Sequence, residues 1–258
     1  MKRLLLLISL FLILVGCGSG ANSQIAATVT PGATATPTPT VAPTPPIPDV
    51  PARIVHFVTS DHFHLTGSLY GRGKTIVICS HMLRTTREIW SESGIPQRLA
   101  VQGYAVLTYD FRGSGDSEGP PDIWSLDVDL RAAVAFARQQ GATKIVLMGA
   151  SMGGTASLKV AAEEQVSAVI SLSGPQSFSV SVSDQEIQGM KIPKLFMASQ
   201  TDEPFVTDAK HMYALAPAPK EIYIYPGNNH GTAIFGGDNG DDPAQRIFHF
   251  LAQYVPAD

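Results

Sequence analysis

Residues 144–154, KIVLMGASMGG, constrain the fold of this chain more than any other stretch. A short apolar run rich in β-branched residues stops at Gly149, Ser151 follows, and Gly153 opens a helical segment of small residues. The pattern G-x-S-x-G between a strand and a helix is typical of a tight, strained turn that presents a nucleophilic serine. Glycine suits both flanking positions because a side chain there would crowd the neighbouring strand and helix. We therefore expect Ser151 to be a nucleophile.

Apolar strands alternate with helical segments from Arg53 to the end of the chain. This alternation predicts a parallel sheet that is covered by helices on both faces. A β-hairpin is expected first, over residues 55–58 and 64–70. Further strands are expected at 75–79, 105–109, 145–148, 169–172, 194–198 and 221–225, and helices at 87–102, 123–140, 153–164, 207–214 and 243–254.

Four landmarks in chain order make residues 53–258 resemble the α/β-hydrolase superfamily. SHML, residues 80–83, follows the third strand, where the family usually has His-Gly-x. DFRGSGDS, residues 110–117, is similar to the family's D-x-R-G-x-G-x-S loop, and the fifth strand then delivers Ser151. ASQTD, residues 198–202, and PGNNHG, residues 226–231, resemble the acid and histidine loops. The resemblance implies an α/β-hydrolase fold with a mostly parallel central sheet and helices on both faces.

A serine nucleophile needs two further side chains. Its hydroxyl is a poor nucleophile near neutral pH, so a histidine must accept the proton during attack. His230 is the candidate, because its glycine-rich loop follows the last apolar strand. The histidine in turn needs an acid that fixes its tautomer, and Asp202 matches the family position, with Glu203 as the alternative. The resemblance therefore implies a catalytic triad of Ser151, Asp202 and His230.

The negative charge that develops on the substrate oxygen needs hydrogen-bond donors. One is the backbone N–H of Met152, directly after the nucleophile, and the family position of the second is Leu83, with Met82 as the alternative. The sequence departs from the family here, because Met82 stands where the family prefers glycine. This departure predicts a narrower site or a shifted loop. His81 is interpreted as a structural hydrogen-bonding residue beneath the loop.

The connection between the sixth strand and the acid strand is short. Many members of the superfamily insert a helical cap at this place, but residues 174–193 are too few and too Ser-rich to build one. We therefore expect no substantial cap domain and an open site. This makes the chain similar to compact dienelactone-hydrolase-like or small esterase members, although those dienelactone hydrolases use cysteine where this chain has Ser151.

The first 51 residues predict an export signal and a tether. Residues 1–16 combine a basic start with an apolar run that is too short to span a bilayer, which is typical of a signal peptide. LVGC, residues 14–17, resembles a bacterial lipobox and implies lipidation of Cys17, the alternative being an ordinary secretory signal. Residues 17–51 are rich in Thr and Pro and predict an extended tether. Residues 52–258 have the size of one domain.

These patterns together predict an extracytoplasmic, membrane-anchored serine hydrolase. We expect a carboxylic-ester hydrolase that forms an acyl-enzyme on a small-molecule ester or acyl substrate, a mechanism that needs no metal or organic cofactor. The net charge of −4 and the lack of a basic block argue against nucleic acid as a partner. Two alternatives stay open. One is an acyltransferase or peptidase of the cell envelope with the same triad, and the other is a non-catalytic binding module of the same fold.

Overall fold

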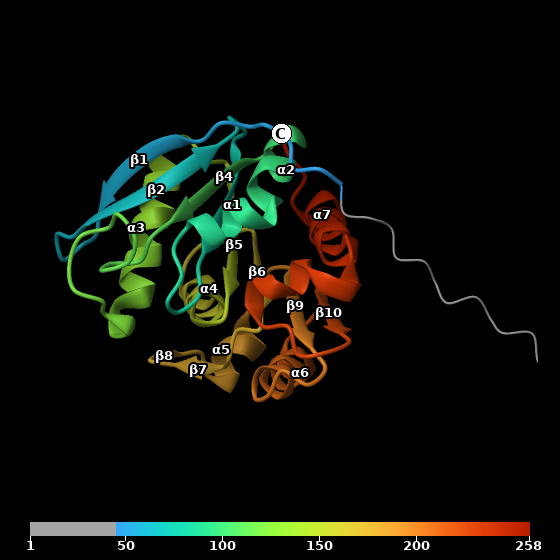
Figure 1. The fold of residues 1–258 in the computed structure, drawn as a ribbon. Helices are drawn as coiled ribbons and strands as arrows, with labels where there is room; N and C mark the ends of the chain where they lie inside the picture. The colour runs from blue at the N-terminus through green and yellow to red at the C-terminus, as the bar shows by residue number, and fades with distance from the viewer. Residues whose placement is uncertain (1–44) are drawn as a thin grey trace, which may run out of the picture. The chain divides into compact units, whose positions relative to one another are not determined.

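The chain folds around one eight-stranded sheet with the strand order β1-β2-β4-β3-β5-β6-β9-β10. The computed structural model describes residues 45–258, and Figure 1 shows the sheet flanked by helices. The strands are β1 (Arg53–Val58), β2 (His64–Tyr70), β3 (Thr75–Ser80), β4 (Ala105–Tyr109), β5 (Lys144–Ala150), β6 (Ala168–Leu172), β9 (Lys194–Ser199) and β10 (Lys220–Tyr225), with a separate pair formed by β7 (Ser177–Phe178) and β8 (Val180–Ser181).

The pairing of the strands places the candidate residues at one edge of the sheet. β1 and β2 form the predicted antiparallel hairpin, and β2 also pairs antiparallel with β4. All later neighbours are parallel, from β4 and β3 through to β9 and β10. The mostly parallel sheet is therefore confirmed. Because parallel strands end at the same edge, the loops after β3, β5, β9 and β10 lie on the same side of the molecule.

Helices cover both faces of this sheet and enclose two apolar cores. On one face, Leu130, Ala156 and Met212 belong to a core that includes α3, α4 and α6. On the other face, Leu99 and Ile247 belong to a core that includes α1, α2 and α7. The helices are α1 (Glu88–Ser93), α2 (Ile95–Val101), α3 (Leu126–Gln139), α4 (Met152–Glu163), α5 (Asp184–Gly189), α6 (Phe205–Leu215) and α7 (Asp242–Tyr254), and the 3-10 turns are η1 (Ile123–Ser125), η2 (Gly231–Phe235) and η3 (Gly237–Asn239).

The single helix expected over residues 87–102 is wrong, because the chain forms α1 and α2 there instead. Gly94 separates them with φ 73° and ψ −1°, a left-handed conformation that ends α1. Pro96 lies in the first turn of α2, where its missing N–H costs nothing. The apolar period continues across the break, since Trp90 and Leu99 are both fully buried in the same core.

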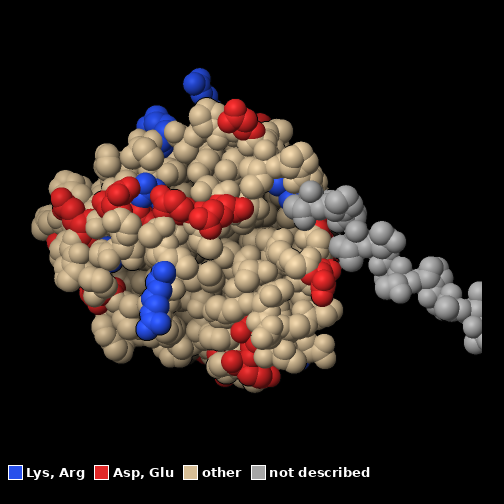
Figure 2. All heavy atoms as spheres, viewed as in Figure 1, with Lys and Arg blue, Asp and Glu red and all other residues tan. Residues whose placement is uncertain are grey.

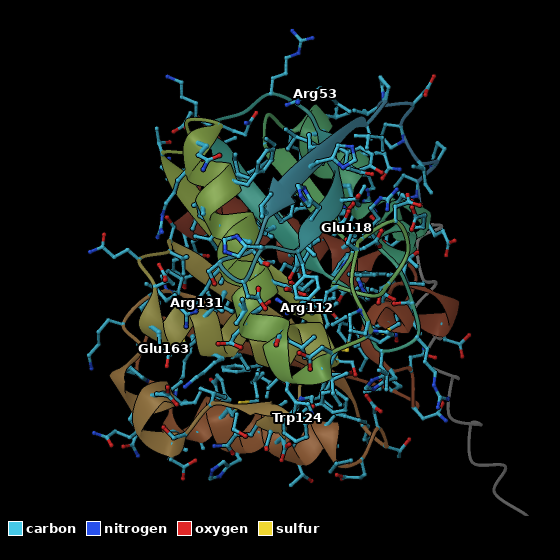
Figure 3. The ribbon with its side chains drawn as sticks, turned by 90° about the vertical axis from the view of Figure 1, so that its left-hand side faces the viewer. Arg53, Arg112, Glu118, Trp124, Arg131 and Glu163 are labelled. Carbon is cyan, nitrogen blue, oxygen red and sulfur yellow. The ribbon has the colours of Figure 1, made fainter. Side chains whose placement is uncertain are left out.

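The connection between β6 and β9 contains no large cap, as predicted. It consists of the short β7–β8 hairpin and the six-residue helix α5, which begins with a capping box between Ser183 and Glu186. The turn η1 contacts β8, and its Trp124, labelled in Figure 3, is 72% exposed. The fold thus leaves the carboxyl edge of the sheet without a covering domain.

The predicted signal peptide, Cys17 and most of the predicted tether lie outside the described residues. Within residues 45–258, no helix is long and apolar enough to cross a bilayer. The described part of the N-terminal segment already lies against the domain before β1 begins. A Cβ atom at Gly94 would lie only 2.8 Å from Cγ1 of Ile47, so the Ile47 side chain packs directly on the break between α1 and α2.

Candidate active site

Ser151 lies in the turn that joins β5 to α4. Its backbone has φ 53° and ψ −122°, which is strained for a residue with a side chain. The Ser151 N–H donates to the Leu172 carbonyl oxygen at 2.8 Å, which fixes the turn to β6. A Cβ atom at Gly149 would lie 2.0 Å from the Gly153 carbonyl oxygen, and one at Gly153 would lie 2.4 Å from that of Ser80. Both glycines are therefore required by close backbone contacts, as the sequence predicted.

Asp202 and His230 form a hydrogen-bonded pair at the same edge of the sheet. The Nδ1 atom of His230 lies 3.0 and 3.1 Å from the two carboxylate oxygens of Asp202. Asp202 is buried, whereas a third of the His230 side chain is exposed, and the Phe205 ring lies 4.2 Å from the His230 ring. The alternative acid, Glu203, is exposed and instead accepts a hydrogen bond from Thr207. Of the two candidate acids, Asp202 is the one that contacts His230.

Three loops converge on Gly231, the residue after His230. A Cβ atom at Gly231 would lie 3.3 Å from Cβ of Ala150, the residue before Ser151, and 2.3 Å from Sδ of Met82. The histidine loop therefore packs directly on both the serine turn and the loop after β3. Among the hydrogen bonds of the described residues, none joins the Ser151 hydroxyl to His230. Hydrogen bonds of catalytic groups are often long in the absence of substrate and shorten when it binds.

The loop after β3 is a turn closed by Thr85. The Thr85 N–H donates to the Met82 carbonyl oxygen at 3.3 Å, and the Thr85 hydroxyl donates to the same oxygen at 2.9 Å. The Met82 N–H donates to the Thr85 hydroxyl at 3.2 Å, so it has an acceptor already. Arg84 completes the turn with φ 62°. Within the described residues neither the Leu83 N–H nor the Arg84 N–H has an acceptor, so the Leu83 N–H is available as a donor.

Two backbone donors are thus available for an anionic oxygen. Met152 is the first residue of α4, so its N–H has no acceptor within the helix and points out of the helix end. The N-terminus of a helix also carries partial positive charge, which stabilises an anion. The Leu83 N–H, from a residue that is 45% exposed, is the candidate for the second donor. These are the two positions that the sequence resemblance implied.

His81 lies at the base of this loop, where two hydrogen bonds hold its ring in one tautomer. Its Nδ1 atom lies 2.7 Å from the Met82 carbonyl oxygen, and its Nε2 atom lies 3.1 Å from the Phe111 nitrogen. A carbonyl accepts and an N–H donates, so Nδ1 carries the proton and Nε2 accepts. Burial lowers the pKa of His81, which agrees with a neutral ring. The structural interpretation of His81 is confirmed.

Buried ion pairs anchor the neighbouring DFRGSGDS loop. Asp110 pairs with Arg87 and also accepts the Arg87 backbone N–H at 2.7 Å. Arg112 pairs with Asp129 of α3, with 2.8 Å between Nε and a carboxylate oxygen, and Figure 3 shows Arg112 beside α3. These carboxylates are committed to arginines. Among residues 45–258 no group of three or more His, Cys, Asp or Glu residues has the arrangement of a metal site.

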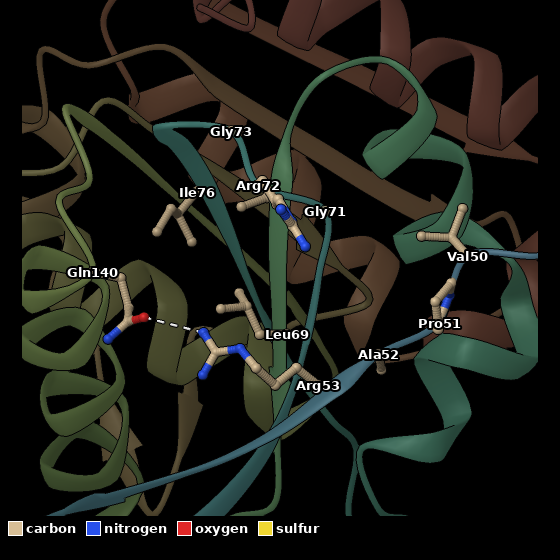
Figure 4. A pocket seen from close by; sticks show the side chains of 11 residues that line it. Val50, Pro51, Ala52, Arg53, Leu69, Gly71, Arg72, Gly73, Ile76 and Gln140 are labelled. Atoms are coloured by element: carbon tan, nitrogen blue, oxygen red, sulfur yellow. Dashed lines mark hydrogen bonds between the residues drawn. The ribbon is translucent and has the colours of Figure 1, made fainter.

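Surface charge and cavities help to locate the site. Figure 2 shows acidic side chains gathered in a band on one face, with few basic ones, so that face has no basic patch. A cavity of about 660 Å³ lies between Arg53, Gly73 and Gln140, and Figure 4 shows the hydrogen bond from Arg53 to Gln140. Because Gly73 precedes β3, this cavity lies at the amino ends of the parallel strands. The candidate site lies at the opposite edge.

Comparison with known proteins agrees with this geometry. A family model described as alpha/beta hydrolase fold matches residues 75–206, just over half of the chain. The chain belongs to the α/β hydrolase fold family. The matched residues contain the loop after β3, the DFRGSGDS loop, Ser151 and Asp202.

Relatives and solved structures of this family differ widely in coverage. The quorum-quenching protein AidA of Acinetobacter baumannii is 36% identical over 104 residues, which are 37% of this chain and only 34% of AidA. The uncharacterized protein YfhR of Salmonella typhi is 24% identical over 72% of this chain and 76% of its own. The α/β hydrolase chain also resembles the Pyrococcus furiosus esterase Pf2001, with TM-score 0.69 and 18% identity over 80% and 93% of the two chains. The dienelactone hydrolase of Anabaena variabilis gives TM-score 0.67 and 21% identity over 80% and 98%.

Two features of the site were missed from the sequence. One is Thr85, whose only signal is a hydroxyl three residues after Met82, a spacing typical of turns closed by Ser or Thr. The other is the packing of Met82 on Gly231, which no local pattern indicates because the two loops are far apart in sequence. Met82 fills the space above Gly231, and Leu83 stays the candidate for the second donor.

Proposed function

We propose that this α/β hydrolase is a serine carboxylic-ester hydrolase that works through an acyl-enzyme. The observation that supports the proposal is the convergence of a strained serine turn with the hydrogen-bonded Asp202–His230 pair. A buried carboxylate that accepts from Nδ1 of a histidine one third exposed leaves Nε2 free to accept a proton, which supports this role.

Each residue of the site has its own role in the proposed reaction. His230 Nε2 accepts the proton from Ser151, and the serine oxygen attacks the ester carbonyl carbon. Asp202 stabilises the imidazolium, while the N–H groups of Met152 and Leu83 stabilise the oxyanion. His230 then donates its proton to the leaving alkoxide, which departs as an alcohol. Water, activated by the same histidine, hydrolyses the acyl-enzyme and restores Ser151.

The proposed substrates are small or accessible esters. The lack of a large cap supports an open site, and the similar folds of the Pyrococcus furiosus esterase and of the esterase RhEst1 from Rhodococcus support ester chemistry. An acyltransferase or peptidase would share the triad. Addition of alcohol or amine acceptors tests this alternative, because a transferase would form the acylated acceptor in preference to the free acid.

We also propose that the protein is exported and held on a membrane by lipid at Cys17. The sequence LVGC at residues 14–17 supports this location. Several acyl chains on one cysteine would anchor the protein stably, since each buried methylene contributes about 0.8 kcal/mol. In cells fed labelled palmitate, the wild-type chain should incorporate label and a Cys17→Ser variant should not. Equal labelling of both would contradict lipidation at this residue.

The test of the enzymatic proposal needs no knowledge of the substrate. The full-length chain is treated with a fluorophosphonate probe, which reacts only with an activated serine, beside Ser151→Ala. We expect labelling of the wild type and none of the variant. Asp202→Asn should reduce the labelling rate by about a thousandfold or more, because the histidine loses the partner that sets its tautomer. Glu203→Gln is the matched control and should label at the wild-type rate. A folded wild type that resists the probe would favour the non-catalytic binding module.

A further inference from the structure

An apolar groove of about 380 Å³ adjoins the candidate active site. It lies between α1, the loop after β3, η2 and the N-terminal segment that precedes β1. Glu92 is the one charged residue of its lining. The side chains on which the argument depends are Ile47, Met82, Ile89, Thr232, Ala233 and Phe235.

Met82 connects this groove to the histidine loop. Its side chain lines the groove and packs on Gly231, the residue directly after His230. The Thr232 hydroxyl lies 3.9 Å from the Met82 sulfur and also lines the groove. The Met82 thioether therefore contacts both the groove and Gly231. Methionine is unbranched and flexible, so it can adapt its shape to a bound alkyl group.

The position of the groove indicates whether it would bind the alcohol part or the acyl part of an ester. His230 must deliver its proton to the leaving oxygen, so the leaving alcohol has to lie on the His230 side of the tetrahedral intermediate. The groove begins at Thr232 and Ala233, two and three residues after His230. We propose that this groove binds the alkyl chain of the leaving alcohol, so that the preferred substrates are esters of unbranched apolar alcohols. This inference rests on the proposed ester hydrolysis.

Ile47 gives the groove its outer wall. It belongs to the segment before β1, packs on Gly94 and is 49% exposed. The segment that the sequence assigns to the tether thus contributes a side chain to substrate selection. The test uses the full-length chain, because a protein that begins at residue 52 would lack this wall.

The test compares two series of esters. In one series acetate is joined to methanol, butanol or octanol, and in the other methanol is joined to acetate, butyrate or octanoate. We expect kcat/KM to rise along the alcohol series by up to about fourfold per methylene until the groove is filled. We expect a much weaker trend along the acyl series. A stronger trend along the acyl series would overturn the assignment.

Substitutions then tie the preference to the groove. Ile47→Glu places a charge at its wall, and Ala233→Trp fills it from an exposed position. Each should lower the ratio of kcat/KM for octyl acetate over methyl acetate by about tenfold. Ile54→Glu is the matched control, because Ile54 is 52% exposed on the distant strand β1, and it should keep the wild-type ratio.

Probe labelling distinguishes a failure of the groove assignment from a failure of the hydrolase proposal. If Ser151 reacts with the fluorophosphonate but both groove variants keep the wild-type ratio, the groove assignment is wrong and the hydrolase proposal stands. If Ser151 does not react and no ester is cleaved, both are wrong. A urea unfolding curve for each variant shows whether a lost ratio comes from the groove or from loss of the fold.

Discussion

The two loops that supply the proposed oxyanion donors are built in opposite ways. The turn at Ser151 is held by backbone contacts so close that Gly149 and Gly153 admit no side chain. The loop after β3 is partly exposed and is held by one hydroxyl, that of Thr85, and one buried imidazole, that of His81. Close packing dominates in the first loop, and hydrogen bonds dominate in the second.

This difference predicts how each loop responds to a substitution. A change in the serine turn must move the strand and helix that meet there, so it costs stability of the whole fold. A change in the loop after β3 moves only a few exposed residues, so it displaces one donor, the Leu83 N–H. We therefore expect the first kind of variant to unfold and the second to stay folded with a lower rate.

The largest effect is expected for Gly149→Ala. Its Cβ would lie 2.0 Å from the Gly153 carbonyl oxygen, and the nearby atoms are all backbone and cannot turn away. The free energy of unfolding should fall by about 3 kcal/mol, measured by urea denaturation. Gly189→Ala is the matched control, since no atom lies within 4 Å of its Cβ position, and it should change stability by less than about 1 kcal/mol. If both variants lose the same free energy of unfolding, close packing at Gly149 is not what stabilises the serine turn.

Thr85→Val should keep the fold and slow the reaction. The variant has nearly the same shape but loses both hydrogen bonds between the hydroxyl and Met82. We expect kcat to fall about tenfold with little change in KM, because the Leu83 donor is no longer held in place. Thr143→Val removes an exposed hydroxyl that donates to Asp258 at 2.9 Å, and serves as the control. If Thr85→Val retains full kcat, the turn does not position the donor.

Acid should weaken the loop after β3 through His81. Burial lowers the pKa of His81 in the native state, so below about pH 6.5 the unfolded chain binds a proton that the native chain does not. Stability then falls as the pH falls. Between pH 6.5 and pH 5.5 the protonation of His81 in the unfolded chain should lower the free energy of unfolding, and His81→Asn should show a smaller loss in unfolding curves at the two pH values. If the wild type and His81→Asn lose the same free energy of unfolding between the two pH values, groups other than His81 cause the pH dependence.

The smallest effect is expected at Arg84. Its φ of 62° is unfavourable for a residue with a side chain and suits glycine. Arg84→Gly should raise the free energy of unfolding by about 0.5 kcal/mol, whereas Arg84→Val should lower it by about 1 kcal/mol, because β-branched residues tolerate this conformation least. The order of the two variants in urea denaturation decides the outcome, and the reverse order would contradict strain at this residue.

The serine turn was predictable because its chemistry demands glycines that are adjacent in sequence. The strands were predictable for a similar reason, since β3 and β5 are buried along most of their length and appear as apolar runs. The break between α1 and α2 also had a signal in Gly94 and Pro96. The continuous apolar period across residues 87–102 outweighed it in the prediction, because both helices pack on one core.

The loop after β3 was less predictable because its geometry depends on distant residues. Met82 can replace the expected glycine only because Gly231 leaves space for its side chain. Ile47 was assigned to the tether because its neighbours are proline and threonine, and composition says nothing of a single side chain that packs on Gly94. Both features arise where loops from different parts of the chain meet.

The short connection between β6 and β9 has a consequence for the evolution of this architecture. The β7–β8 hairpin is small, its Ser177 and Ser181 are exposed, and β9 pairs with β6 from Lys194 onward. Surface loops tolerate long insertions because closing a longer loop costs little additional entropy. New segments can therefore be inserted at the hairpin without altering the register of the sheet.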